Sequence, residues 1–228
     1  MTTERKTAII IGSLFLISTT TFLIGDELIG SIVYTPEYLK NSYPNVNLIG
    51  LGVILQLIND IAVVSIGVIF LPILKNHHQN IAFAYMGSRI IEGALLLVSA
   101  VSLLSIVLLS EQYLNIITTE VSYFETLGVL FKAGRYTAFQ LAMIALSTGS
   151  LLLCYLLYRT KLIPRILSIL GFIGYTLLLL KMLTEIAGYS FGGEMLYLPG
   201  ALFEILMPLW LIIKGFNVSS NISYAKKV

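Results

Sequence analysis

Six long apolar blocks dominate this sequence and limit what it can fold into. They cover about residues 8–24, 48–74, 81–109, 136–158, 166–187 and 195–213. A helix needs about 20 apolar residues to cross the roughly 30 Å hydrocarbon core of a bilayer. The chain is also only 11% charged, whereas a soluble domain has about 25% charged residues. The blocks therefore predict one all-α membrane domain over residues 1–228, with six transmembrane helices in contact with the lipid bilayer.

The positive charges between the blocks predict the orientation of the chain. Cytoplasmic flanks of membrane helices carry an excess of Lys and Arg. With six spans, the side that holds both termini carries nine of these residues: Arg5, Lys6, Lys75, Arg159, Lys161, Arg165, Lys214, Lys226 and Lys227. The opposite side carries three: Lys40, Lys132 and Arg135. We therefore expect a multi-pass protein with both termini in the cytoplasm.

Two longer segments between the blocks are more polar. Residues 25–47 contain several tyrosines, which favour the membrane–water interface. Residues 110–135 alternate glutamates with aromatic residues, which predicts an amphipathic helix on the outer surface rather than a span. No small-x-small cleavage site precedes Gly25, so we expect the first block to stay as an anchor.

Composition and motifs exclude several classes of function. The net charge of +2 and the lack of a long Lys/Arg run argue against nucleic-acid binding. The single cysteine, Cys154, allows no disulfide within the chain. The only histidines, His77 and His78, lie in a loop, so no axial haem ligand lies within the bilayer. With no Walker loop, nucleophile elbow or HExxH motif, the sequence predicts no metal site and no cofactor, and leaves enzymatic activity open.

Glycines recur within the apolar blocks. Small residues let membrane helices approach each other closely, because no side chain separates the backbones. We expect this role for six of them: Gly12, Gly67, Gly93, Gly149, Gly171 and Gly174.

Ionisable residues inside the blocks are the strongest candidates for a functional site. There are six: Asp60, Arg89, Glu92, Lys181, Glu185 and Glu204. A charge at the bilayer centre costs about 2.5–3.5 kcal/mol, so six unpaired charges would cost roughly 15–20 kcal/mol. That exceeds the total stability of a typical fold, about 5–15 kcal/mol. The six side chains must therefore pair, bind protons or face a wet cavity rather than lipid.

Spacing predicts two ion pairs among these residues. Arg89 and Glu92 are three residues apart, and Lys181 and Glu185 are four apart, so each pair shares a helical face. Such pairs can serve a binding site, or they can only fix helix packing and register. The six residues are four acids and two bases, a net of −2 that leaves room for a bound proton or a cationic ligand.

Asp60 and Glu204 have no oppositely charged residue three or four positions away on their own helix, so they are the stronger functional candidates. We predict a polar core that extends across the bundle, in which Glu204 bridges the two ion pairs. Four further residues are predicted as hydrogen-bonding neighbours: Gln56, Asn59, Gln140 and Thr184. Tyr136 and Tyr175 are weaker candidates for this role.

Several short strings resemble a known family in their order and spacing. They are RIIEG at 89–93, LIPRILS at 162–168, LGFIG at 170–174, PGALFE at 199–204 and LWLIIKGF at 209–216. Together they resemble the bacterial membrane family catalogued as domain of unknown function four-three-eight-six. The resemblance covers about residues 5–216 and is weakest over residues 110–132. It implies six spans in a bacterial inner membrane, and it implies no established activity.

Three classes of function are compatible with these features. A protein that binds or transports a small or cationic ligand with proton exchange predicts a water-accessible central cavity. A membrane-embedded enzyme acting on a lipid or isoprenoid predicts a cavity open sideways to lipid, with carboxylates as general acid and base. An accessory structural subunit predicts a dry core in which the charges satisfy one another. The sequence slightly favours binding or transport, with the ligand and the oligomeric state left open.

Overall fold

The computed structural model describes residues 2–115 and 121–217. Every regular element in this part of the chain is helical, and six helices are long and apolar enough to cross a membrane. They are α1 (Thr3–Val33), α3 (Val46–Lys75), α4 (Gln79–Asn115), α5 (Val121–Thr160), α6 (Arg165–Ile186) and α7 (Leu198–Ile213). Two short elements, α2 (Tyr38–Asn41) and the 3₁₀ helix η1 (Glu194–Tyr197), lie in the connections. The predicted all-α bundle of six spans is confirmed.

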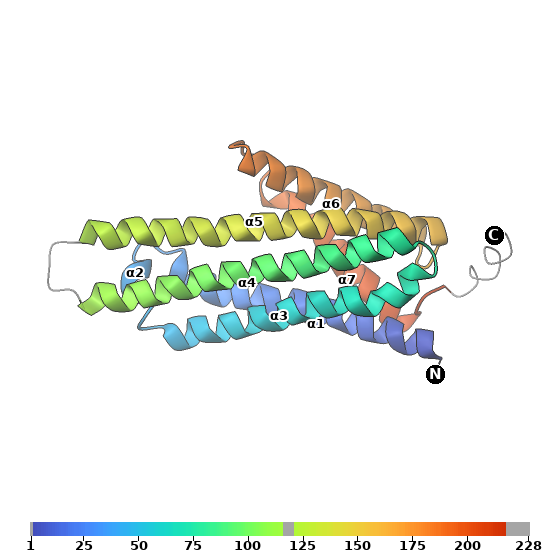
Figure 1. Ribbon diagram of the computed structural model, residues 1–228, viewed down its shortest axis with the longest axis horizontal. Coiled ribbons are helices and arrows are strands. Elements are labelled where there is room, and N and C mark those ends of the chain that lie inside the picture. The colour runs from blue at the N-terminus through green and yellow to red at the C-terminus, as the bar shows by residue number, and fades with distance from the viewer. Residues whose placement is uncertain (1, 116–120, 218–228) are drawn as a thin grey trace.

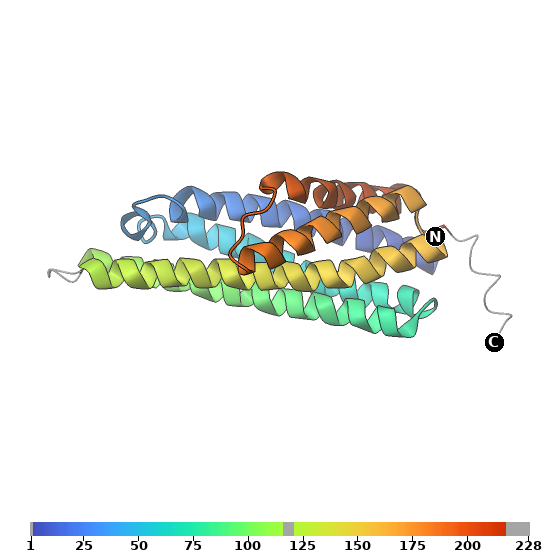
Figure 2. The ribbon, with the colours of Figure 1, turned by 90° about the horizontal axis from the view of Figure 1, so that it is seen from above.

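The six spans form a closed ring in chain order. Each span packs against the next, and α7 returns to pack against α1 (Figures 1 and 2). Arg5 closes the ring, because its guanidinium donates to the Leu211 carbonyl at 2.8 Å and to the Ile213 carbonyl at 3.1 Å. Carbonyls in the last turn of a helix lack partners within that helix. Arg5 therefore joins the start of the first span to the end of the last one.

Glycines lie where neighbouring helices approach most closely. A Cβ atom added to any of them would lie within 2.9 Å of an atom on the adjacent span. The interfaces and their glycines are α1–α3 (Gly25, Gly52), α3–α4 (Gly67, Gly93), α4–α5 (Gly149), α5–α6 (Gly171), α6–α7 (Gly174) and α7–α1 (Gly12). The close approach predicted for six of these glycines is confirmed, and every interface of the ring contains at least one.

Several helices are longer than the apolar blocks predicted. The first span continues to Val33, past Asp26 and Glu27, because the later residues Ile29 and Val33 pack into an apolar core. The surface helix expected over residues 110–135 is wrong, because residues 110–115 end α4 and residues 121–135 begin α5. Bilayer thickness sets the least length of a spanning helix and places no upper limit on it.

The ring has unequal walls. At 1.5 Å per residue, α4 with its 37 residues is about 55 Å long, whereas α6 with 22 residues is about 33 Å. The shorter helices α6 and α7 lie beside only one half of the long helices. This is the half of the bundle in which α1 begins (Figure 1). The larger apolar core is formed by residues of all six spans. Apolar residues of α1, α2, α3 and α4 form a second, smaller core towards the other end.

Candidate functional site

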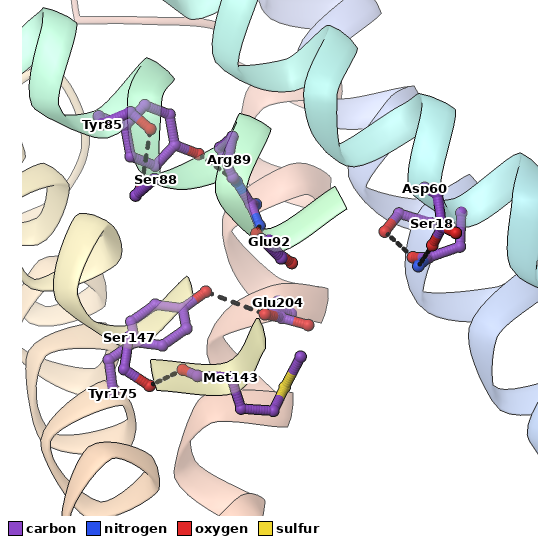
Figure 3. Close-up of polar contacts among 11 residues, drawn as sticks. Ser18, Asp60, Tyr85, Ser88, Arg89, Glu92, Met143, Ser147, Tyr175 and Glu204 are labelled. Carbon is purple, nitrogen blue, oxygen red and sulfur yellow. Dashed lines mark hydrogen bonds and ion pairs between the residues drawn. The ribbon is translucent and has the colours of Figure 1, made fainter. Parts of the chain in front are cut away.

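A buried ion pair on α4 is the centre of the candidate site. Arg89 Nη1 donates to Glu92 Oε2 at 2.7 Å, and only 3% of each side chain is exposed. Arg89 Nε donates to the Tyr85 hydroxyl at 3.1 Å, one turn earlier on the same helix (Figure 3). The guanidinium also lies over the Phe15 ring of α1, 5.4 Å from the ring centroid. The pairing that the three-residue spacing predicted is present, and it faces the interior of the helix ring.

Glu204 on α7 faces this pair across the site. The Tyr175 hydroxyl of α6 donates to Glu204 Oε1 at 3.0 Å, and Thr19 of α1 also interacts with the carboxylate. Figure 3 shows the Glu92 and Glu204 side chains pointing toward one another, and the two carboxylates interact electrostatically. The Arg89 cluster is defined here as Tyr85, Arg89, Glu92, Tyr175 and Glu204. Three spans, α4, α6 and α7, contribute to it.

Asp60 lies near the Arg89 cluster, in a hydrogen-bonded group of its own on α3. Asn59 Nδ2 donates to Asp60 Oδ1 at 3.1 Å, and Ser18 Oγ of α1 donates to Asn59 Oδ1 at 2.6 Å. Asp60 is 5% exposed and interacts electrostatically with Glu92. Its Oδ2 accepts no hydrogen bond from residues 2–115 or 121–217. Asn59 is thus the neighbour that was predicted, whereas Gln56 packs against α1.

The second predicted ion pair forms a separate polar group near the end of α6. Lys181 pairs with Glu185 and lies over the Tyr197 ring, 5.2 Å from its centroid. The Tyr136 hydroxyl and Gln140 Nε2, both on α5, donate to Glu185 Oε2 at 2.7 Å and 3.2 Å. Gln140 and, as a weaker candidate, Tyr136 were predicted as hydrogen-bonding neighbours. This group ties α5, α6 and η1 together.

The structure does not join these two groups into one polar core. Within the described residues, no hydrogen bond or ion pair connects Lys181 or Glu185 to Glu204, so the expected bridge through Glu204 is absent. Thr184 does not serve as a neighbour either, because its hydroxyl donates to two carbonyls of its own helix at 2.8 Å and 2.9 Å. The candidate site is therefore the Arg89 cluster with Asp60, and the Lys181 pair lies outside it.

A third polar group was not predicted. Arg135, counted from the sequence among the outer-side charges, is only 7% exposed within α5. Its Nη2 donates to Asp26 Oδ1 on α1 at 3.0 Å, its Nη1 donates to the Tyr34 hydroxyl, and its carbonyl accepts from Ser99 Oγ at 3.1 Å. The opposite charges of Asp26 and Arg135 are visible in the sequence. Only the rotation of α1 and α5 within the bundle brings them together.

The charges of the site do not balance if every group is ionised. Asp60, Glu92 and Glu204 carry three negative charges, and Arg89 carries one positive charge. Moving an ion into a low-dielectric interior is costly unless it is paired, so two of these three carboxylates need a proton or a cation. The arrangement can therefore take up protons or a positively charged group.

Two cavities of the described part of the chain lie away from these carboxylates. One, of about 430 Å³, lies where α1 begins and α3 ends, and it is lined by residues that include Glu4, Thr7, Pro72 and His77. The other, of about 310 Å³, is a groove on the surface of α5 between Ser122 and Leu130. The Arg89 cluster thus lies in packed protein between the two ends of the ring.

Six apolar spans that enclose a polar interior define a polytopic α-helical membrane protein. The chain belongs to the family described as "Domain of unknown function (DUF4386)", which matches residues 10–215. No curated protein and no solved structure matches the chain.

Proposed function

We propose that the protein binds a small cationic ligand at the Arg89 cluster and Asp60, and releases protons in exchange. The observation that supports this proposal is the number of buried acids near a single guanidinium. Glu92 and Glu204 both interact electrostatically with Arg89. The third acid, Asp60, interacts with Glu92. An arriving cation would take the place of protons held by these acids. Intramembrane ionisable residues of this kind commonly mark ion pathways and proton relays.

Each residue has a distinct part in this proposal. Arg89 and Glu92 neutralise each other and form the fixed centre, held by Tyr85. Glu204 and Asp60 are the exchanging acids, because among the described residues neither has a cation at hydrogen-bond distance. Pro208 lies four residues after Glu204 on α7 and cannot donate a hydrogen bond to the Glu204 carbonyl, so the last span is weakened beside the site.

The test is a proton-release assay in proteoliposomes that contain a pH-sensitive dye. Sodium, potassium, choline and ethidium are added outside in turn, and the dye reports proton movement. We expect at least one cation to produce a response in the wild type and the Glu194→Gln control, whose acid is exposed in η1. Glu204→Gln should abolish it. A response that survives Glu204→Gln, or no response to any of the four cations, would refute the proposal.

A structural role for the Arg89 cluster is the second candidate. It is favoured by the absence of the cluster from the lining of the two cavities described above, and by the hydrogen bonds of Arg89 to Glu92 and Tyr85. In this case Glu204→Gln would change the stability of the protein and no dye response would exist to be lost. The same variant therefore separates the two candidates.

The proposed location is the bacterial cytoplasmic membrane, with both termini in the cytoplasm. The charge asymmetry that supports this orientation persists when Arg135, which is ion-paired within α5, is removed from the count. Lys40 and Lys132 then remain on the outer side. Lys226 and Lys227 lie outside the described residues, and seven positive residues stay on the cytoplasmic side without them. Fusions of a reporter that fluoresces only in the cytoplasm to either terminus test the orientation.

A further inference from the structure

One face of α1 leads from the Arg89 cluster towards the far end of the ring. Phe15 contacts Arg89, and Thr19 interacts with Glu204. Phe22 and Asp26 follow at spacings of three and four residues, which keeps all four side chains on the same helical face. The residues next along this face are therefore the first that a ligand would meet between the cluster and the far end.

The facing side of α5 presents matching residues. The Phe139 ring stacks on the Phe22 ring, with the centroids 6.0 Å apart and the planes at 11°. One turn further out, Arg135 Nη2 donates to Asp26 Oδ1 at 3.0 Å, and the guanidinium lies 5.5 Å from the centroid of the Tyr34 ring. The α1–α5 seam is defined here as Phe22, Asp26, Tyr34, Arg135 and Phe139.

The seam crosses the interior of the ring. In the ring, α1 neighbours α3 and α7, whereas α5 neighbours α4 and α6, so a direct contact between α1 and α5 spans the enclosed space. Tyr136, the residue after Arg135, shows where the seam lies along the axis of the bundle. Its hydroxyl donates to Glu185 in the last turn of α6. The seam therefore closes the ring where the wall made by α6 ends.

The other end of the ring is closed differently. The Phe70 ring makes edge contacts with Tyr85 and Phe216, at centroid distances of 6.0 Å and 5.8 Å. All three side chains are buried in the larger apolar core. The seam, in contrast, depends on one ring pair and one ion pair, and 42% of the Asp26 side chain is exposed. The ion pair of the seam is therefore partly exposed, whereas Phe70 and Tyr85 at the other end are fully buried and Phe216 borders the cavity of about 430 Å³.

We infer that the α1–α5 seam is a gate, which opens the Arg89 cluster to the side of the membrane opposite the termini when the Asp26–Arg135 pair separates. This inference rests on the proposed function, because it describes how a cation would reach the acids. Opening requires the exposed Asp26 carboxylate to become hydrated and the Phe22 and Phe139 rings to part. Opening also requires the guanidinium of Arg135 to release the Tyr34 hydroxyl, which accepts its other hydrogen bond.

The gate can be tested by the accessibility of a cysteine behind it. Because Cys154 is the only cysteine, Cys154→Ser gives a chain without thiols, and Thr19→Cys then adds one beside Glu204. The protein in lipid nanodiscs is treated with a polar maleimide, and the labelling rate is measured. We expect Asp26→Asn to raise this rate about fivefold. A fivefold change corresponds to about 1 kcal/mol, the upper end of the energy of a partly exposed ion pair. The control is Glu27→Gln, an exposed neighbour, which should leave the rate unchanged.

A second variant guards against misfolding as an explanation. Phe22→Leu opens the ring pair without touching the ion pair, and it should also speed labelling, while elution as a single species shows that each variant is folded. Equal rates for Asp26→Asn, Phe22→Leu and Glu27→Gln would overturn the gate, as would labelling of the Thr19→Cys protein at the rate of the denatured chain. Labelling requires no cation and no proton release, so the gate and the proposed exchange can fail separately.

Discussion

Removal of the Arg89 charge should destabilise the bundle far more than removal of its partner. Arg89→Met leaves the two carboxylates of the cluster, Glu92 and Glu204, with no cation, and breaking a buried ion pair in this way costs about 3–5 kcal/mol. Glu92→Gln leaves Arg89 beside Tyr85 and within electrostatic reach of Glu204. Its loss is one hydrogen bond between charged groups, about 1.5–3 kcal/mol.

The double variant Arg89→Met/Glu92→Leu completes the comparison. Replacing both members of a buried pair by apolar residues is often neutral, so the double variant should be more stable than Arg89→Met alone. The free energy of unfolding is measured by titrating micelles of the protein with a denaturing detergent and following the fluorescence of Trp210, the only tryptophan. Acidic pH should reduce the difference in free energy of unfolding between Arg89→Met and the wild type, because protonated carboxylates no longer need a cation.

Two results would refute this reasoning. If Glu92→Gln cost as much as Arg89→Met, then Glu204 would not be supporting Arg89, and the cluster would not act as one electrostatic unit. If the double variant were as unstable as Arg89→Met, the loss would come from packing around the long arginine side chain rather than from its charge.

Three further predictions concern the packing and the ends of the ring. Gly174→Ala should lower the free energy of unfolding by about 1–3 kcal/mol through overpacking, since its Cβ would lie 2.4 Å from a backbone nitrogen of α7. Gly87→Ala, whose Cβ would meet no described atom within 4 Å, should raise that free energy by up to about 1 kcal/mol through helix propensity. Thermal unfolding distinguishes the two variants. Arg5→Met should lower the free energy of unfolding by about 1–3 kcal/mol through loss of its charged hydrogen bonds, with exposed Lys6→Met as the control, and equal losses would argue against ring closure by Arg5. Burial lowers the pKa of His77. The contribution of neutral His77 to stability is therefore complete above the unfolded pKa of about 6.5 and is lost as pH falls. His77→Gln should flatten the change in Tm between about pH 7 and about pH 5, and an unchanged pH profile of Tm would contradict this.

The sequence predicts most of the architecture because a bilayer restricts helices to long apolar runs. It predicts the ion pair of Arg89 with Glu92 for a similar reason, since a spacing of three residues fixes which side chains share a face. It fails at helix ends, where the continuation of α1 past Asp26 depends on packing between spans rather than on local composition.

Contacts between distant spans are what the sequence could not supply. Tyr175 and Glu204 lie 29 residues apart, and Asp26 and Arg135 lie 109 apart, so neither pair follows from helical periodicity. The relative rotation of two spans decides whether such side chains meet. In this ring that rotation is set by many close contacts at once, including those made possible by the glycines at each interface.

The bond between Arg5 and the end of α7 has a consequence for how the protein is made. The two partners are 206 residues apart, so Arg5 leaves the ribosome long before Leu211 does. Until the final helix is inserted, the earlier helices form an open crescent whose inward polar side chains have lipid on one side. A chain that stops before α7 would lack Glu204 and remain in that crescent form, which makes it a ready substrate for the proteases that remove unassembled membrane proteins.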